Sequence, residues 1–246
     1  MGDIRAFLPA QKARSGSRVG STYSVPVSSL NPKDVEAHQK YLTLQARCSF
    51  GAPPPAFEAW SIVDGVLHVP RFYGMHRFGP AETDDRVEGD AINISFQGQL
   101  NEVQLRANAA TDEKHFSRQG DGGCIICLPC GYGKTVWAIH QIVRLGRKAC
   151  ILVHKGVLRD QWKASFERFC PGVKVGIIQG NVFQVDGYDV VIAMVMTMAR
   201  REQDPRMDVF GVVCCDEAHH LAAPVMHQAL GMFRARYVIA LTATKE

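Results

Sequence analysis

Six apolar runs of strand length constrain the fold of this chain more than any other feature. Stretches with helical spacing separate them, and the runs span residues 124–128, 150–153, 173–178, 190–194, 209–215 and 237–241. Strands that are apolar throughout are typical of a parallel sheet covered by helices on both faces. We therefore predict a doubly wound α/β domain over residues 94–246. Such sheets bind their ligands at the carboxyl ends of the strands.

A glycine-rich segment, Leu-Pro-Cys-Gly-Tyr-Gly-Lys-Thr at residues 128–135, follows the first run and opens a helical stretch. Gly131 and Gly133 allow the backbone to approach a phosphate closely. Lys134 supplies a positive charge for the β- and γ-phosphates, and the Thr135 hydroxyl is a ligand for Mg²⁺. We predict a P-loop, although the general pattern has another glycine at the first of these positions. A glycine-rich turn with an exposed lysine is the alternative interpretation.

Two adjacent carboxylates, Asp216 and Glu217, end the fifth apolar run. Nucleotide hydrolysis needs one acid to hold Mg²⁺ and another group to orient and deprotonate the attacking water. We predict that Asp216 serves the metal and that Glu217 serves the water. Solvated charges at a strand end are one alternative. A metal cluster is the other, and its candidate ligands are Asp216, His219, His220 and His227.

Three motifs, in this order, resemble motifs I, II and III of superfamily 2 helicases of the DEAD/DEAH type. They are Gly-Tyr-Gly-Lys-Thr at 131–135, the DEAH box Asp-Glu-Ala-His at 216–219, and Leu-Thr-Ala-Thr at 241–244. Residues 152–162 resemble motif Ia of the XPB-like and type III restriction-subunit group, and helicases of large nucleocytoplasmic DNA viruses are also similar. The resemblance implies a RecA-like domain, the first of two motor halves, that uses ATP and Mg²⁺. It implies four catalytic residues: Lys134, Asp216, Glu217 and His219.

The resemblance also implies roles for residues outside these motifs. Residues 96–104 are similar to the family's adenine-side segment, with Gln104 at the base edge, although Asn101 stands where the family usually has Arg. Thr242 and Thr244 would couple the nucleotide state to the nucleic-acid face. Six further residues match segments that contact the sugar-phosphate backbone of the tracked strand: His154, Lys155, Gly156, Gln179, Gly180 and Thr197.

The sequence before residue 94 has a different character. Residues 1–30 are rich in Ser, Gly and Arg and show no sustained periodicity, so we predict a mobile arm there. An organelle transit peptide is the alternative interpretation. Residues 31–93 are predicted to form a small α+β unit, whose acidic, glycine-containing stretch 82–90 serves as the linker to the next domain.

Two local patterns support the α+β unit. Asn31 and Pro32 are typical of a helix start, and the helix is predicted to run through Tyr41. Asp64-Gly65 joins two β-prone runs and predicts a hairpin. Basic and aromatic residues follow it, as in nucleic-acid platforms, although aromatic residues beside a hairpin also serve as core; they are Arg71, Phe72, Tyr73, His76 and Arg77.

Composition limits the class of protein. The net charge of +4 arises in residues 96–246, which suits nucleic acid as a partner, and the resemblance favours DNA over RNA. The sequence has no apolar run long enough for a membrane span and no secretory signal. Because most of its eight cysteines fall in apolar stretches, we expect a reducing compartment inside the cell: cytoplasm, nucleus or viral factory. We interpret Cys124, Cys127 and Cys130 as buried small apolar residues, and zinc bound by these three is the alternative.

The sequence ends two residues after the third motif. In the family, a second RecA-like domain supplies the arginines that stabilise the transferring phosphoryl group, and no later segment supplies them here. We expect either a separate chain that completes the motor or a truncated, nucleotide-dependent nucleic-acid-binding module without turnover. By itself the chain is expected to bind ATP weakly and to hydrolyse it very slowly.

Overall fold

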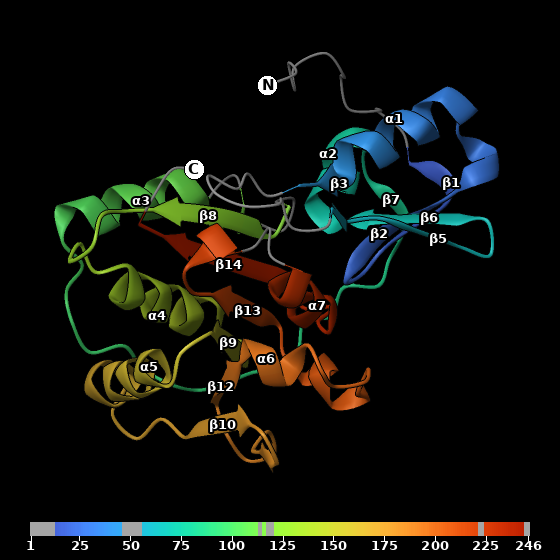
Figure 1. Ribbon diagram of the computed structural model, residues 1–246. Coiled ribbons are helices and arrows are strands. Elements are labelled where there is room, and N and C mark those ends of the chain that lie inside the picture. Colours follow the sequence, from blue (N-terminus) through green and yellow to red (C-terminus); the bar gives the residue numbers. More distant parts are fainter. Residues whose placement is uncertain (1–12, 46–55, 113–114, 117–120, 221–223, 244–246) are drawn as a thin grey trace, which may run out of the picture. The chain divides into compact units, whose positions relative to one another are not determined.

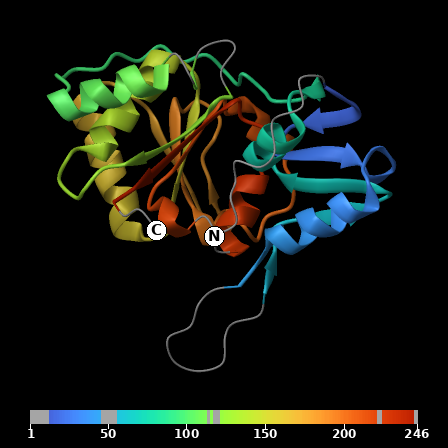
Figure 2. The same ribbon diagram turned by 90° about the horizontal axis from the view of Figure 1, so that it is seen from above.

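The computed structural model describes residues 13–45, 56–112, 115–116, 121–220 and 224–243 (Figures 1 and 2). The chain divides into two compact units, Met1–Arg86 and Val87–Glu246, each with its own sheet and core. No helix formed by the described residues is both long and apolar enough to cross a membrane.

The boundary between the units differs from the predicted one between residues 93 and 94. The observed boundary lies within the predicted linker 82–90. Residues on both sides of it nevertheless pair within their own unit. Ala81–Asp84 form a strand of the first unit. Val87 forms a bridge with Ala235 of the second unit.

The first unit is a small α+β fold, as predicted. Its elements are β1 Arg14–Val19, β2 Thr22–Pro26, the 3-10 helix η2 Val27–Ser29, α1 Pro32–Leu42, β3 Thr43–Leu44, β4 Phe57–Glu58, β5 Ser61–Val63, β6 Val66–Pro70, α2 Arg71–Phe78 and β7 Ala81–Asp84. The main sheet has the order β5-β6-β2-β1-β7, and β3 pairs with β4. All neighbouring strands are antiparallel except β1 and β7, which are parallel.

The predicted mobile arm is wrong for its described part, because residues 14–26 form β1 and β2 in the middle of this sheet. Tyr23 and Val25 alternate with polar neighbours and are wholly buried in the core. That alternation is short, and the strands are held by pairing with β6 and β7. Residues 1–12 lie outside the described residues.

The predicted helix start and hairpin are confirmed. The Asn31 side chain accepts a hydrogen bond from the Lys33 backbone N–H at 3.0 Å. Asp64 and Gly65 have φ angles of 50° and 75°, as a two-residue hairpin turn requires. Of the residues after the hairpin, Tyr73 stacks on the exposed Tyr41 with ring centroids 5.6 Å apart, and the Arg77 guanidinium lies over both rings.

The second unit contains the predicted parallel sheet. Its elements are α3 Glu102–Asp112, β8 Gly123–Cys127, α4 Lys134–Leu145, β9 Ala149–Val153, α5 Gly156–Phe169, β10 Val175–Gln179, β11 Val182–Phe183, β12 Val190–Met194, α6 Val195–Met198, the 3-10 helix η3 Pro205–Val209, β13 Val212–Cys215, the 3-10 helix η4 Ala218–His220, α7 Pro224–Gly231 and β14 Tyr237–Thr242. The strand order is β11-β10-β12-β9-β13-β14-β8, parallel except for β11.

Helices cover both faces of this sheet. On one face, Trp137 of α4 and Trp162 of α5 pack in a core that includes Ile151 and Cys214. On the other, α6, η3 and α7 contribute Met198, Met207, Met226 and Ala229 to a second core. Figure 1 shows α4 and α5 on one side of the strands and α6 and α7 on the other. The predicted doubly wound architecture is confirmed.

Because six strands run in one direction, their carboxyl ends meet at one edge of the sheet. The P-loop follows β8, His154 follows β9 and Asp216 follows β13. β8 and β13 are separated only by β14, so the two predicted halves of the nucleotide site begin about 10 Å apart.

Candidate functional site

The P-loop has the backbone conformation that its glycines were predicted to provide. Gly131 and Gly133 have φ angles of 84° and 76°, in the left-handed region that favours glycine. Gly133 is the N-cap of α4, and neither a capping side chain nor an acidic residue occupies the first turn of this helix. The free N–H groups of that turn, together with the positive end of the helix dipole, suit a phosphate.

Lys134 lies over this loop. Its Nζ donates hydrogen bonds to the carbonyl oxygens of Leu128 and Pro129, at 2.9 and 3.3 Å. The ammonium group is therefore already at the loop, where it can exchange these carbonyl contacts for phosphate oxygens. Thr135 lies in the same first turn of α4 and is partly exposed.

Gln104 of α3 contacts the P-loop directly. Its Nε2 donates to the Gly133 carbonyl at 2.8 Å, and its Oε1 accepts from the Asn101 N–H at 2.8 Å. Asn101 Oδ1 accepts in turn from the Gln104 N–H at 2.9 Å, so the two residues form a capping box at the start of α3. Both polar ends of this buried side-chain amide therefore form hydrogen bonds with backbone groups. Its role at a base edge stays a prediction.

Asp216 is held in a fixed orientation at the end of β13. It is 8% exposed, and its N–H continues the ladder to the Leu152 carbonyl at 3.1 Å. One carboxylate oxygen accepts from the Trp162 indole at 2.8 Å, and the other accepts from the Glu217 N–H at 2.9 Å. The sequence pattern did not reveal the Trp162 contact, because 54 positions separate the two residues.

Glu217 has a strained backbone. Its φ angle of 56° is in the left-handed region, which is rare for a side chain of this size and typical of functional sites. Its Oε2 lies 3.2 Å from Nδ1 of His219, and the two side chains are equally exposed, at 31%. The Glu217 carboxylate thus lies beside His219.

Thr242 ends β14 and connects to the P-loop. It is buried and lies opposite Cys127 in the sheet, and its carbonyl accepts from the Leu128 N–H at 3.1 Å. The predicted coupling residue Thr242 is therefore adjacent to the phosphate loop. Thr244 lies outside the described residues.

A pocket of about 270 Å³ lies between Glu217 and the segment after β9. It is lined by His154, Lys155, Val157, Leu158, Glu217 and His219. Lys155 is the N-cap of α5, and Gly156 is the first residue of that helix. The structure therefore brings two predicted backbone-contact residues, His154 and Lys155, together with two residues of the DEAH box.

The other predicted contact residues form a separate cluster after β10. The Gly180 N–H donates to Thr197 Oγ1 at 3.1 Å, and Gly180 has a φ angle of 55°. Two arginines that the sequence analysis did not single out complete the cluster. Arg201 donates to the Gly180 carbonyl at 3.1 Å, and Arg159 of α5 contacts Gln179.

The cysteines differ from the predicted pattern at the P-loop. Cys150, Cys214 and Cys215 are wholly buried, and burial raises the pKa of the Cys150 and Cys214 thiols well above the ordinary range. Cys130, however, is exposed, because it belongs to the loop and not to the strand. The interpretation of these cysteines as buried apolar residues is wrong for Cys130. All described cysteines are free thiols.

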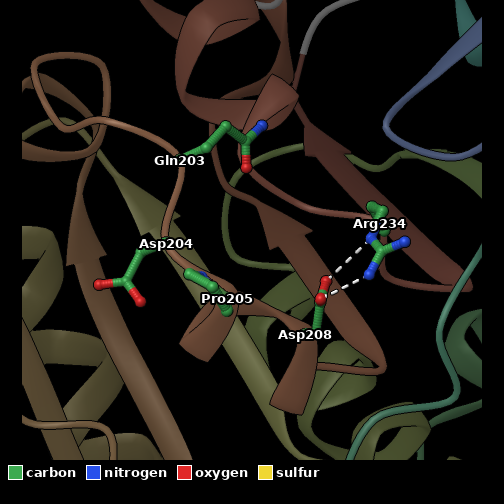
Figure 3. Close-up of a pocket in the computed structure, with 5 residues that line it drawn as sticks. All are labelled: Gln203, Asp204, Pro205, Asp208 and Arg234. Atoms are coloured by element: carbon green, nitrogen blue, oxygen red, sulfur yellow. Dashed lines mark hydrogen bonds and ion pairs between the residues drawn. The ribbon is translucent and has the colours of Figure 1, made fainter.

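A second pocket, of about 410 Å³, lies at the opposite edge of the sheet (Figure 3). Asp208 of η3 and Arg234 form a bidentate pair there, with N–O distances of 3.0 and 2.5 Å. Since η3 leads into β13 and Arg234 precedes β14, the pocket lies at the amino ends of these strands, away from the P-loop. Its other lining residues are Gln203, Asp204 and Pro205.

The site geometry agrees with the comparisons to known proteins. The family model described as type III restriction enzyme, res subunit, matches residues 97–246. The chain belongs to this family. The family match, with the relatives and the fold, confirms a first RecA-like domain of the superfamily 2 helicase type.

Named relatives include a putative ATP-dependent RNA helicase of Acanthamoeba polyphaga mimivirus, 26% identical over 72% of this chain and 34% of that protein. A putative helicase of Invertebrate iridescent virus 6 is 31% identical over 63% of this chain and 35% of its own. A putative DNA 3'-5' helicase Rad25 of Haloarcula marismortui is 25% identical over 78% of this chain and 30% of its own. The chain thus spans about a third of the length of these relatives.

Two solved structures share the fold of this helicase domain. The UvsW helicase from bacteriophage T4 has a TM-score of 0.60 at 12% identity, covering 93% of this chain and 92% of that one. The Sulfolobus solfataricus SWI2/SNF2 ATPase core in complex with dsDNA has a TM-score of 0.50 at 20% identity, covering 64% of this chain and 34% of that one.

Proposed function

We propose that this chain is the ATP-binding motor domain of a superfamily 2 helicase or translocase, and that it binds ATP with Mg²⁺ at the Gly131–Thr135 loop. One observation carries the proposal: the loop and the Asp216–Glu217 pair occupy the same edge of the sheet, one strand apart. Backbone N–H donors for phosphate, the Lys134 cation and two carboxylates are thus present at one edge of the sheet, and phosphoryl transfer requires these groups.

The residues fit a Mg²⁺ ion. Asp216 keeps acceptor capacity after its two hydrogen bonds, because each carboxylate oxygen can accept more than one. The Thr135 hydroxyl would be the second oxygen ligand, since Mg²⁺ prefers a few such ligands together with phosphates. The ion would neutralise charge that develops on the phosphates.

Glu217 is proposed to orient the attacking water and to accept its proton, with His219 fixing the carboxylate through the 3.2 Å contact. Turnover and movement are proposed to need a second RecA-like domain, on the same or a separate chain, that supplies arginines for the transition state. Thr242 and Thr244 are proposed to transmit the nucleotide state to the nucleic-acid face.

Nucleic acid is proposed to lie along the two clusters at the same edge, one around Lys155 and one around Gly180 and Thr197. The first offers Lys155 and the backbone N–H groups at the start of α5, and the second offers the Thr197 hydroxyl and Arg201. Such groups suit phosphates and read no sequence. We favour DNA because one neighbour was solved with dsDNA, although one relative is named for RNA. Binding of labelled single-stranded DNA and RNA at several salt concentrations would decide between them.

Titration with a fluorescent ATP analogue tests the nucleotide site. Lys134→Ala should weaken binding roughly 10- to 100-fold, since hydrogen bonds to charged groups contribute about 1.5–3 kcal/mol. Lys163→Ala is the matched control, because it removes the same charge from a half-exposed position beside Glu167 on α5. Equal affinities of the wild-type and Lys134→Ala proteins would reject the P-loop assignment.

A further inference from the structure

The Trp162 side chain connects α5 to the acid pair. It is 1% exposed and packs beside Phe166, with ring centroids 5.9 Å apart. Its Nε1 donates a 2.8 Å hydrogen bond to Oδ2 of Asp216. Because both partners are buried, water does not compete for this hydrogen bond.

Trp162 and the Glu217 N–H together determine how the Asp216 carboxylate is oriented. Each donates to a different oxygen, so two contacts at opposite ends fix the plane of the carboxylate. The lone pairs that remain on these oxygens point in fixed directions. A ligand that approaches Asp216 therefore meets a preset geometry and not a freely rotating side chain.

Packing alone does not explain this contact. Trp137 of α4 is equally buried in the same core, yet its Nε1 has no hydrogen-bond partner among the described residues. A tryptophan can thus pack in this core through its apolar surface alone, without a hydrogen bond from its indole N–H. At position 162, the N–H group is the feature that a phenylalanine would lack, and it meets the one carboxylate that the proposed mechanism assigns to Mg²⁺.

We propose that Trp162 is a positioning residue for the Mg²⁺ of the nucleotide site, acting through its hydrogen bond to Asp216. This inference rests on the proposed function of the site. Groups that orient a metal ligand typically change metal affinity by roughly 10- to 100-fold when they are removed. The loss of the indole N–H should therefore weaken Mg²⁺ binding while the P-loop contacts to the nucleotide remain.

The test compares Trp162→Phe with the matched control Trp137→Phe, which removes the same volume and an N–H without a described partner. The measured quantities are the affinity for a fluorescent ATP analogue in excess EDTA and the Mg²⁺ concentration that gives half of the Mg²⁺-dependent gain. Mn²⁺ binding followed by electron paramagnetic resonance gives the metal affinity directly. We expect a half-saturation roughly 10- to 100-fold higher in Trp162→Phe, unchanged affinity in EDTA, and wild-type metal dependence in Trp137→Phe.

A second pair of variants separates the hydrogen bond from packing. Replacing Trp162 by β-(3-benzothienyl)alanine puts sulfur in place of the indole N–H and keeps the shape of the side chain, so it serves even if Trp162→Phe folds poorly. It should reproduce the weaker Mg²⁺ binding. In an Asp216→Asn background, where the metal ligand is already changed, the same replacement should have little further effect.

The outcomes distinguish this inference from the proposed function. If the wild-type chain shows no Mg²⁺-dependent nucleotide binding, the proposed function is wrong, and the proposed role of Trp162 is then wrong as well. If the wild type shows that dependence but the benzothienylalanine variant has the same Mg²⁺ half-saturation, only the role of Trp162 is overturned. An equal loss in the Trp137→Phe control would also overturn it, because a general effect of core packing would then explain the result.

Discussion

At the scale of single residues, Asp216 and Glu217 are neighbours in sequence with different surroundings. Asp216 is buried and accepts hydrogen bonds from Trp162 and from the backbone, whereas Glu217 is partly exposed beside His219. Glu217 also has a left-handed backbone conformation, with a φ angle of 56°. One position therefore suits a fixed metal ligand, and the other suits a group that exchanges protons with water.

This difference predicts distinct effects of two isosteric substitutions. Glu217→Gln should keep Mg²⁺-dependent ATP binding. In the motor completed by a second RecA-like domain, it should lower hydrolysis by about 10²–10⁴-fold, because an amide cannot accept the proton of water. Asp216→Asn should weaken Mg²⁺-dependent binding. It should also destabilise the fold by about 1–3 kcal/mol, because the amide NH₂ faces one of two buried donors.

Hydrolysis assays, nucleotide titrations with and without Mg²⁺, and urea unfolding of both variants provide the comparison. Similar behaviour of the two variants in all three measurements would contradict the proposed division of roles.

Gln104 yields another residue-scale prediction, because its two possible roles differ in nucleotide specificity. If the amide supports the P-loop through Gly133, Gln104→Ala should weaken ATP and GTP binding alike, by about tenfold for one buried hydrogen bond. If the amide leaves Gly133 to read the base, the variant should lose affinity for ATP and not for GTP. Competition titrations with the two nucleotides against one fluorescent analogue give this ratio.

At the scale of elements, the sequence predicted strands best where every residue of the strand is buried, because burial then produces a continuous apolar run. The strands β9 and β13 are buried at every position, so their apolar runs are unambiguous. β1 and β2 were missed because most of their residues are polar or small and only a few point into the core. Their stability comes from pairing with β6 and β7, which lie far away in sequence.

In the candidate site, too, the residues of local motifs were predicted, whereas the contacts between distant elements were not. Lys134 and the Asp216–Glu217 pair were predicted from local motifs because phosphate binding and metal binding need these residue types in a fixed local order. The contacts Trp162–Asp216, Gln104–Gly133 and Arg201–Gly180 join residues from different elements. Only the packing of the helices against the sheet brings these pairs together, so no local pattern reports them.

The packing of α2 leads to an element-scale prediction. Gly74 lies directly on Tyr23 of β2, and a Cβ at this position would overlap the tyrosine side chain. Alanine is preferred over glycine within a helix by about 1 kcal/mol, whereas overpacking of a core typically costs about 1–3 kcal/mol. Since Tyr23 is wholly buried and cannot easily move, Gly74→Ala should destabilise the protein.

Gly231→Ala is the matched control for this helix substitution, because it lies in the last turn of α7 with no heavy atom within 4 Å of the added Cβ. Thermal unfolding should show a lower midpoint for Gly74→Ala and a midpoint near that of wild type for Gly231→Ala. A Gly74→Ala midpoint at or above that of the wild type would mean that helix propensity outweighs the overlap with Tyr23.

At the scale of the whole molecule, partly buried histidines in both units connect stability to pH. Burial lowers the pKa of His38 in the first unit, and the nearby Arg77 lowers it further. Burial also lowers the pKa values of His140 and His227 in the second unit. In the folded protein, all three imidazoles therefore stay neutral to a lower pH than in the unfolded chain, where their pKa is the ordinary 6.5.

The sign of the resulting pH dependence follows from proton binding. Well above pH 6.5 neither state holds these protons, so the full stability is present. As the pH falls below 6.5, the unfolded chain binds up to three protons that the folded protein does not yet hold, and the free energy of unfolding decreases until the lowered pKa values are passed. We expect progressively easier urea unfolding between pH 7 and 5.5.

The variant His140→Phe tests this expectation. It keeps an aromatic ring beside Phe96 but cannot titrate, so the free energy of unfolding should change less with pH, by the contribution of one bound proton. If the wild-type protein is equally stable at pH 7 and 5.5, or if His140→Phe leaves the slope unchanged, burial of these histidines does not govern the acid response.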